Sequence, residues 1–222
     1  MAITKTVFTA TTQAANAAEV YAFLNANKSG WFDSVTQDES GNIICTVGGV
    51  DCLKLGFDGS TKSVKISAAN GTSRQGYFAN IKWEYAYATS KGLWLYSYAL
   101  FSSIAAYPIS IFITNTDSGD TAIVAICDGS STAEMAFITA DVLNDGVVRR
   151  YYGGGTYSNG SGSKIIYPSG VTTLTPIVLT ESGTSYTPDL FFTLFTQYRF
   201  TPSVLLIGGT RYVYDGRIAL RE

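Results

Sequence analysis

Apolar residues recur at helical spacing in one part of the chain, close to its N-terminus. The segment TQAANAAEVYAFLNANKSG predicts a helix over about residues 12–27. Thr11 or Thr12 can cap its start, and Gly30 can end it. The preceding residues 2–10 have the composition of a short strand. One face of the predicted helix carries four apolar side chains: Ala17, Val20, Tyr21 and Leu24.

Beyond the helix, short runs rich in Val, Ile, Thr, Tyr and Phe alternate with turn signals. Asp-Gly and Asn-Gly pairs tolerate the positive φ of tight hairpin turns, so their recurrence predicts a meander of antiparallel strands. The fold class indicated is mainly β, an antiparallel β-sandwich or an irregular barrel of short hairpin-linked strands with one N-terminal helix. The turn signals are Glu39–Asn42, Asp58–Gly59, Asn70–Gly71, Asp117–Asp120, Asp128–Gly129, Asn144–Gly146, Gly208–Gly209 and Asp215–Gly216.

The length of 222 residues suits one large β domain or two small ones. We expect residues 1–30 to form a strand and helix that can act as an attachment or oligomer element. Residues 31–222 are expected to form the β domain. Glycine is frequent within residues 151–164, so this stretch is either a mobile surface loop or a junction that divides the β domain.

Large aromatic residues occupy alternate positions in the segment IKWEYAYATSKGLWLYSYAL, residues 81–100. A turn at Thr89–Gly92 pairs its two halves so that opposing residue numbers sum to 181, and Ala88 then faces Leu93. This register places six candidate binding residues on one face of the hairpin: Trp83, Tyr85, Tyr87, Trp94, Tyr96 and Tyr98.

The aromatic face of this hairpin has two interpretations. It is either buried core, with its polar tips hydrogen-bonded to backbone, or a contact face that stacks on sugars or fills a protein interface. None of the six residues is Phe, which would fill a core without a polar tip to satisfy. That choice of residue type keeps the contact interpretation open.

Composition points to a surface poor in charge. Hydrophobic residues make up 46% of the chain and charged residues 14%, against roughly 25% charged in typical globular domains. Such a surface is solvated by hydroxyl groups or covered by other copies, so we expect a homo-oligomer, with a trimer among the options. A net charge of −2 with scattered Lys and Arg argues against nucleic-acid binding. No apolar run reaches the roughly 18 residues of a membrane span, so membrane insertion is not expected.

The N-terminus and the cysteines are typical of a protein made in the cytoplasm. The start MAITKTVFTATTQ lacks the basic segment, apolar core and cleavage site of a secretory signal. Cys45, Cys52 and Cys127 lie in apolar, strand-like settings. Buried free thiols are therefore favoured over a Cys45–Cys52 disulfide.

Candidate catalytic chemistry is scarce. The chain has no histidine, which removes the Ser-His-Asp and Cys-His nucleophile systems and the His-based zinc sites. The cysteines lack metal-binding spacing, the Gly-rich loop lacks a phosphate-binding ending, and the acidic segment 114–120 lacks the spaced ligands of a calcium loop. We predict no catalytic residue, no cofactor and no metal site.

Paired carboxylates are the remaining enzymatic option, because a glycosidase needs two acids about 5–10 Å apart. Most aspartates lie in turn signals, where their side chains bond to nearby backbone. Glu84 and Glu134 instead lie inside strand-like segments, where Glu is disfavoured. A glycoside-cleaving enzyme that uses such acids stays open as an alternative.

The two ends of the chain resemble small virion proteins of tailed bacteriophages and prophages from gut bacteria. The start MAITKTVFTATTQAANAAEVYAFLNAN resembles the short β piece and Ala-rich helix that open such proteins. The ending RFTPSVLLIGGTRYVYDGRIALRE is similar to the hairpin that closes many of them. The resemblance implies a structural virion component of tail-fibre, baseplate or head-appendage type, and it carries over no catalytic residue.

The favoured hypothesis is a non-enzymatic structural protein of a phage particle. It would form a homo-oligomer, meet other virion proteins and contact a host-surface glycan or protein. Its location would be the virion, after synthesis in the cytoplasm of the bacterial host without a signal peptide. A carbohydrate-binding module and a glycoside-cleaving enzyme are the alternatives.

Overall fold

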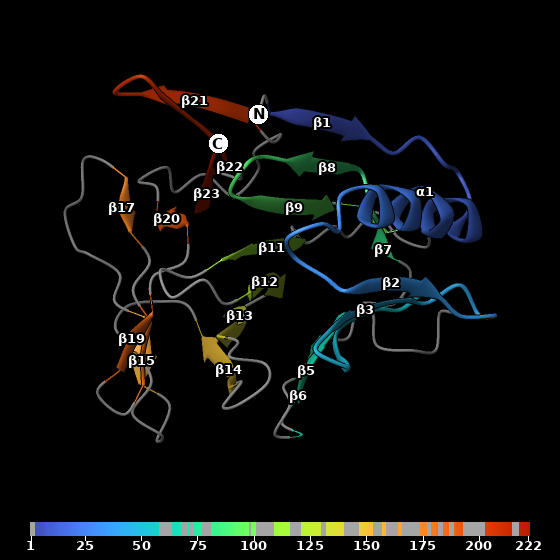
Figure 1. The fold of residues 1–222 in the computed structure, drawn as a ribbon, viewed down its shortest axis with the longest axis horizontal. Helices are drawn as coiled ribbons and strands as arrows, with labels where there is room; N and C mark the ends of the chain where they lie inside the picture. The colour runs from blue at the N-terminus through green and yellow to red at the C-terminus, as the bar shows by residue number, and fades with distance from the viewer. Residues whose placement is uncertain are drawn as a thin grey trace.

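The computed structural model is built from layered β-sheets with a helix beside them (Figure 1). All statements about structure below refer to the residues that it describes. These are residues 3–57, 64–67, 71, 73–76, 81–97, 99–100, 109–115, 121–129, 132–139, 147–152, 157–158, 164–165, 174–176, 179–181, 184–186, 189–192, 203–214 and 218–222.

A seven-stranded sheet, here called the central sheet, organises the fold. Its strand order is β1-β8-β9-β11-β12-β13-β14, and each neighbouring pair is antiparallel. The strands are β1 (Thr4–Val7), β8 (Tyr85–Ala88), β9 (Gly92–Ser97), β11 (Ile109–Asn115), β12 (Thr121–Gly129), β13 (Thr132–Thr139) and β14 (Val147–Tyr152). Four of its six neighbouring pairs join strands that are consecutive in the chain, as a meander predicts.

Two five-stranded sheets flank it. The helix-side sheet, in the order β2-β3-β4-β5-β6, comprises β2 (Ser34–Gln37), β3 (Ile43–Val47), β4 (Val50–Leu55), β5 (Val64–Ser67) and β6 (Ser73–Gly76). The C-terminal sheet, in the order β17-β20-β23-β22-β21, comprises β17 (Thr175–Pro176), β20 (Leu190–Phe192), β21 (Ser203–Ile207), β22 (Thr210–Tyr214) and β23 (Ile218–Arg221).

Two smaller sheets complete the described strands. One is four-stranded, in the order β15-β16-β18-β19, and the other pairs β10 with β7. Their strands are β7 (Ile81–Lys82), β10 (Ala99–Leu100), β15 (Tyr157–Ser158), β16 (Lys164–Ile165), β18 (Leu179–Glu181) and β19 (Thr184–Tyr186).

The middle strands of the central sheet are buried on both faces. In β9, Leu93 and Leu95 enter a core shared with the helix and the helix-side sheet, here called the helix-side core. Trp94 and Tyr96 enter a second core shared with the C-terminal sheet, here called the aromatic core. The predicted antiparallel, mainly β sandwich with one helix is confirmed, and no sheet of the described residues closes into a barrel.

The single helix of the described residues, α1 (Gln13–Ala26), matches the predicted span of 12–27. Its N-cap is Thr12, whose hydroxyl accepts a backbone hydrogen bond from the first turn. Its C-cap is Asn27, whose side-chain amide donates to the Phe23 carbonyl at 2.8 Å. Of the four predicted core-facing residues, three are fully buried and Tyr21 is partly buried against the helix-side core: Ala17, Val20, Tyr21 and Leu24.

Two pairs of glycines form tight turns, of which only Gly208–Gly209 is predicted from the sequence. Gly208 and Gly209 have φ values of 57° and 82° between β21 and β22, and Gly48 and Gly49 adopt the same conformations between β3 and β4. Positive φ at both positions is the requirement of a type I′ hairpin. The prediction of a turn at Asp128–Gly129 is wrong, because the pairing of β12 with β13 continues through both residues.

A buried amide joins α1 to the central hairpin. Asn16 is fully buried, its Nδ2 donates to the Trp83 carbonyl at 2.9 Å, and its Oδ1 accepts from the Trp83 N–H at 2.9 Å. Trp83 lies between β7 and β8, outside the strand ladders. The Asn16 side chain therefore supplies both of the backbone hydrogen bonds that a neighbouring strand would otherwise provide.

The cysteine prediction is confirmed where the side chains are described. Cys45 and Cys52 are free and buried, and the Cys52 thiol donates to the Cys45 carbonyl at 3.2 Å. Burial raises the pKa of both thiols, that of Cys52 to about 12. The side chain of Cys127 lies outside the described part of the chain.

Residues 1–30 are integrated with the β layers, because β1 pairs with β8 and α1 packs in the helix-side core. Their predicted role as an attachment or oligomer element stays a prediction. Most of the Gly-rich stretch 151–164 lies outside the described residues, so the predicted subdivision there also stays a prediction. With 14 residues, α1 is shorter than a bilayer-crossing helix, and no other helix is described.

Replacing Asn16 should expose how strongly this amide supports the fold. Asn16→Ala leaves the buried N–H and C=O of Trp83 without partners, so we expect the free energy of unfolding to fall by about 2 to 5 kcal/mol. Asn25→Ala, which removes a partly buried amide on the same helix that accepts from Lys28 Nζ, is the matched control and should change it by less than about 0.5 kcal/mol. If the two substitutions lower the free energy of unfolding equally in urea denaturation, this role for Asn16 is contradicted.

The buried thiols should make the folded protein less stable at alkaline pH. Below pH 9.0, the ordinary thiol value, folded and unfolded states both keep Cys52 protonated, so the full stability is present. As the pH rises from there toward about 12, only the unfolded state loses the proton, and the free energy of unfolding declines. Denaturation curves measured at a series of pH values should show that the free energy of unfolding declines less steeply with pH in Cys52→Ala than in the wild type. An identical decline in the variant would rule out this thiol as a contributor.

Candidate functional site

The hairpin register predicted from the sequence is confirmed. Tyr85 faces Tyr96, Tyr87 faces Trp94 and Ala88 faces Leu93. The turn also lies where predicted, because the Thr89 N–H donates to the Gly92 carbonyl at 2.9 Å. The same numbering relation holds in the pair β7–β10, where Lys82 faces Ala99.

The prediction that all six rings share one face is wrong for Trp83. Its side chain lies in the helix-side core, whereas Tyr87, Trp94 and Tyr96 lie in the aromatic core on the opposite face. The cause is the break between β7 and β8, where the Trp83 backbone bonds to Asn16 and leaves the ladder. Tyr98, the sixth predicted residue, lies outside the described residues.

The rings of the aromatic core are interior groups. Tyr87, Trp94 and Tyr96 are 2%, 0% and 4% exposed, and Tyr85 is partly buried beside them. Apolar side chains of the C-terminal sheet cover these rings: Leu190, Val213, Ile218 and Leu220. These residues are therefore buried core and offer no open platform for a sugar, although the Trp94 Nε1 makes no hydrogen bond to the described residues.

Within this core, Trp94 lies in an aromatic stack that crosses three strands. Its ring stacks on Tyr87 at a centroid distance of 5.1 Å and on Phe112 at 5.3 Å, and it meets Tyr96 edge-on at 5.8 Å. Burial, and then the neighbouring Tyr85 hydroxyl, raises the pKa of Tyr87 to about 12. Such cross-strand aromatic pairs contribute about 0.5–1.5 kcal/mol each beyond their buried area, so the stack stabilises the hairpin register.

The two candidate acids of the glycosidase alternative lie in one row across the central sheet, on non-adjacent strands. The register aligns Glu134 with Cys127, Ile109 and Ser97, and Glu84 continues the row beside β8. Four strand spacings separate the two backbones, a distance of about 19 Å. Carboxylate pairs in glycosidases lie about 5–10 Å apart, so these two acids do not form such a pair.

A metal site would need several ligand side chains brought close together. No group of three Cys, Asp or Glu side chains in the described part of the chain is close enough to hold an ion. The acidic segment 116–120 lies outside the described residues.

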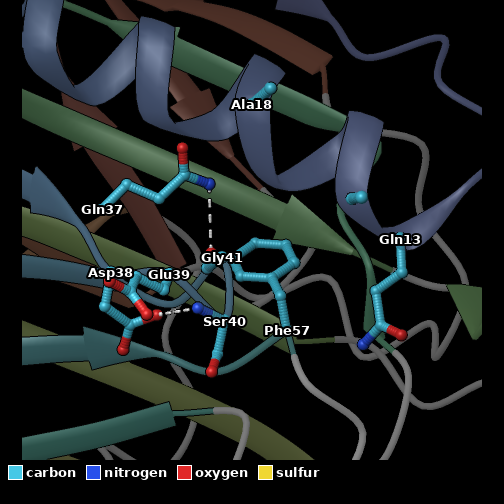
Figure 2. A pocket seen from close by; sticks show the side chains of 9 residues that line it. Gln13, Ala18, Gln37, Asp38, Glu39, Ser40, Gly41 and Phe57 are labelled. Carbon is cyan, nitrogen blue, oxygen red and sulfur yellow. Dashed lines mark hydrogen bonds between the residues drawn. The ribbon is translucent and has the colours of Figure 1, made fainter.

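A polar cavity of about 450 Å³ lies between the start of α1 and the β2–β3 turn (Figure 2). Gln37 donates its side-chain amide to the Gly41 carbonyl across the turn at 3.1 Å. Phe57, at 5% exposure, closes the floor. The lining residues are Gln13, Ala14, Ala18, Gln37, Asp38, Glu39, Ser40, Gly41 and Phe57.

Asp38 holds the turn beside this cavity. Its carboxylate accepts the backbone N–H groups of Ser40 and Asn42 at 3.0 and 2.9 Å and the Asn42 side-chain amide at 3.0 Å. These hydrogen bonds, led by the Asn42 side chain, lower the pKa of Asp38, and Lys54 at 3.8 Å adds to the effect. Asn42 in turn accepts the Phe57 N–H at 2.9 Å, so one hydrogen-bonded chain connects the turn to the cavity floor.

The groups left available to a ligand in this cavity are polar. The side chains of Gln13, Glu39 and Ser40 make no hydrogen bond to other described residues. An amide, a carboxylate and a hydroxyl can bind a small hydroxylated molecule, and the volume lies in the usual range for small-molecule sites.

Sequence reasoning missed a second feature, a group of exposed apolar side chains. Four described large apolar residues are exposed: Val7 at 53%, Val204 at 50%, Leu206 at 70% and Ile207 at 41%. Three of them belong to β21, an edge strand of the C-terminal sheet. The run SVLLI carries the composition of a buried strand, so composition alone could not assign it to an edge.

Comparisons of the chain with protein-family models, curated proteins and solved structures found no match. Function is therefore argued from the arrangement of the residues described above.

Proposed function

We propose that this chain is a non-enzymatic structural subunit of a tailed-phage particle, of tail-fibre, baseplate or head-appendage type. The observation that carries the proposal is where the two terminal segments meet. The backbone N–H of Ile3 is close enough to the Glu222 carboxyl to help lower its pKa, and β1 and β21 lie at the same edge of the fold (Figure 1). These segments carry the resemblance to virion proteins, and the exposed apolar side chains lie on them.

The distribution of apolar surface supports an assembly subunit. Large exposed apolar residues that gather at strand edges are typical of contact surfaces between chains. The low content of charged residues, 14%, is consistent with a protein that covers part of its surface with other chains. The proposed location is the virion, after synthesis in the host cytoplasm.

Purified particles provide the direct test of this proposal. A bacterial strain that carries the gene would be induced, and its particles would be banded on a density gradient and analysed by mass spectrometry. The chain should co-purify with intact particles at a fixed ratio to the major capsid protein. Particles that form without it, while it stays in the soluble fraction, would contradict the proposal.

A carbohydrate-binding function is the second candidate, and the polar cavity between α1 and the β2–β3 turn favours it. A host-surface saccharide would bind through Gln13 and Glu39, and no residue of the aromatic core lines this cavity. Among glycans on an array, any bound one should lose at least about tenfold in affinity in a Gln13→Ala/Glu39→Ala variant, since two hydrogen bonds are removed. Thr36→Ala, an exposed change elsewhere on β2, is the control. If glycan binding is unaffected by the double substitution, this cavity is excluded as the glycan-binding site.

A further inference from the structure

The strand β21 presents one unpaired edge. It pairs with β22 on one side, and no described residue pairs with it on the other. Its sequence Ser203–Ile207 contains no charged residue and no proline, and its pairing with β22 is regular, without a bulge. Edge strands that must stay unpaired usually carry one of these protective features.

The hydrogen-bonding direction along β21 follows from its neighbours. The Glu222 N–H donates to the Arg211 carbonyl at 2.9 Å, so Arg211 directs its backbone groups toward β23. Leu206 lies opposite Arg211, and the two therefore form a non-hydrogen-bonded pair. By alternation, the N–H and C=O groups of Val204 and Leu206 point to the open edge. The two-residue turn at Gly208–Gly209 predicts the same directions for the backbone N–H and C=O groups of β21.

The side chains of these residues extend the core to the same edge. A row of facing residues crosses the C-terminal sheet from Leu190 through Leu220 and Val213 to Val204. The first three are 0% exposed, whereas Val204 is 50% exposed and Leu206, on the same face of β21, is 70% exposed. The apolar row thus ends without a covering partner among the described residues.

We propose that β21 pairs antiparallel with β21 of a second copy, about a two-fold axis that passes through Leu205. Val204 then faces Leu206 of the partner subunit, and Leu206 faces the partner's Val204. Each facing pair exchanges two backbone hydrogen bonds, which gives four bonds across the axis. In the virion subunit proposed above, this contact is one surface through which copies of the chain would associate. The biological setting of the contact rests on that proposed function.

A second copy fits this edge because the edge is self-complementary. The outward-pointing positions 204 and 206 are symmetric about 205, so the antiparallel register brings donors and acceptors together without a shift. Each strand is uncharged, so no like charges meet. The partner's Leu206 also continues the row that ends at Val204. One such strand pair buries less than the roughly 1,200 Å² of a standard interface, so we expect concentration-dependent association.

Sedimentation velocity over a range of concentrations tests the pairing. The wild type should move from monomer to dimer as concentration rises, and Leu206→Lys should stay monomeric, because it sets a charge on the shared edge. Val7→Lys removes another exposed apolar residue, 53% exposed against 70% for Leu206, from β1 and should dimerise like the wild type. A wild type that is monomeric throughout, or a Leu206→Lys variant that associates normally, would overturn the proposal.

A cross-link tests the register and does not depend on how Leu206→Lys folds. The two Leu205 residues would form a non-hydrogen-bonded pair with Cα atoms about 4.5 Å apart, a distance that a disulfide spans. Leu205→Cys should give an oxidised dimer on a non-reducing gel, and Val7→Cys should not. No dimer from Leu205→Cys would overturn the register. Association through another surface would also overturn the β21 pairing, but it would not affect incorporation of the chain into particles. Absence of the chain from particles would refute only the proposed function.

Discussion

The burial of the central sheet on both faces is the constraint on which the rest of this fold depends. Strands of a two-layer sandwich alternate apolar and polar residues, but β9 and β11 must supply apolar side chains to two cores at once. Leu93 and Leu95 fill one core, and Trp94 and Phe112 fill the other. Two covering layers are then required: α1 with the helix-side sheet on one face, and the C-terminal sheet on the other.

The edges of the layers are sealed by specific polar contacts. Asn16 completes the backbone hydrogen bonding of Trp83 where the ladder is interrupted. At the other end of the hairpin, the Thr89 hydroxyl donates to the Arg221 carbonyl at 2.9 Å and ties the turn to β23. Gly92 permits the close approach of β11 beside this turn, since a Cβ there would lie 2.4 Å from the Ile113 carbonyl oxygen. Burial of the hairpin leaves β21, and not the aromatic rings, as the contact surface that we propose.

Local signals allowed much of the fold to be predicted from the sequence. The helix, the turn at Thr89–Gly92 and the hairpin register depend on residues close together in the chain, where spacing and turn chemistry decide the outcome. The face of Trp83 depends on Asn16, which lies 67 residues away, so a hairpin pattern alone assigned it to the wrong side. The cover over the aromatic rings comes from strands that begin about a hundred residues later, at Leu190. The edge position of β21 likewise follows from sheet order, which no local pattern encodes.

Tryptophan emission tests the central claim that the aromatic hairpin is interior. The chain has three Trp residues, and a Trp31→Phe variant keeps only Trp83 and Trp94, which are 1% and 0% exposed. We predict blue-shifted emission from this variant, weak quenching by acrylamide, and no change when oligosaccharides are added. Red-shifted emission with strong quenching, or a shift on adding an oligosaccharide, would contradict the account and restore the hairpin as a contact face.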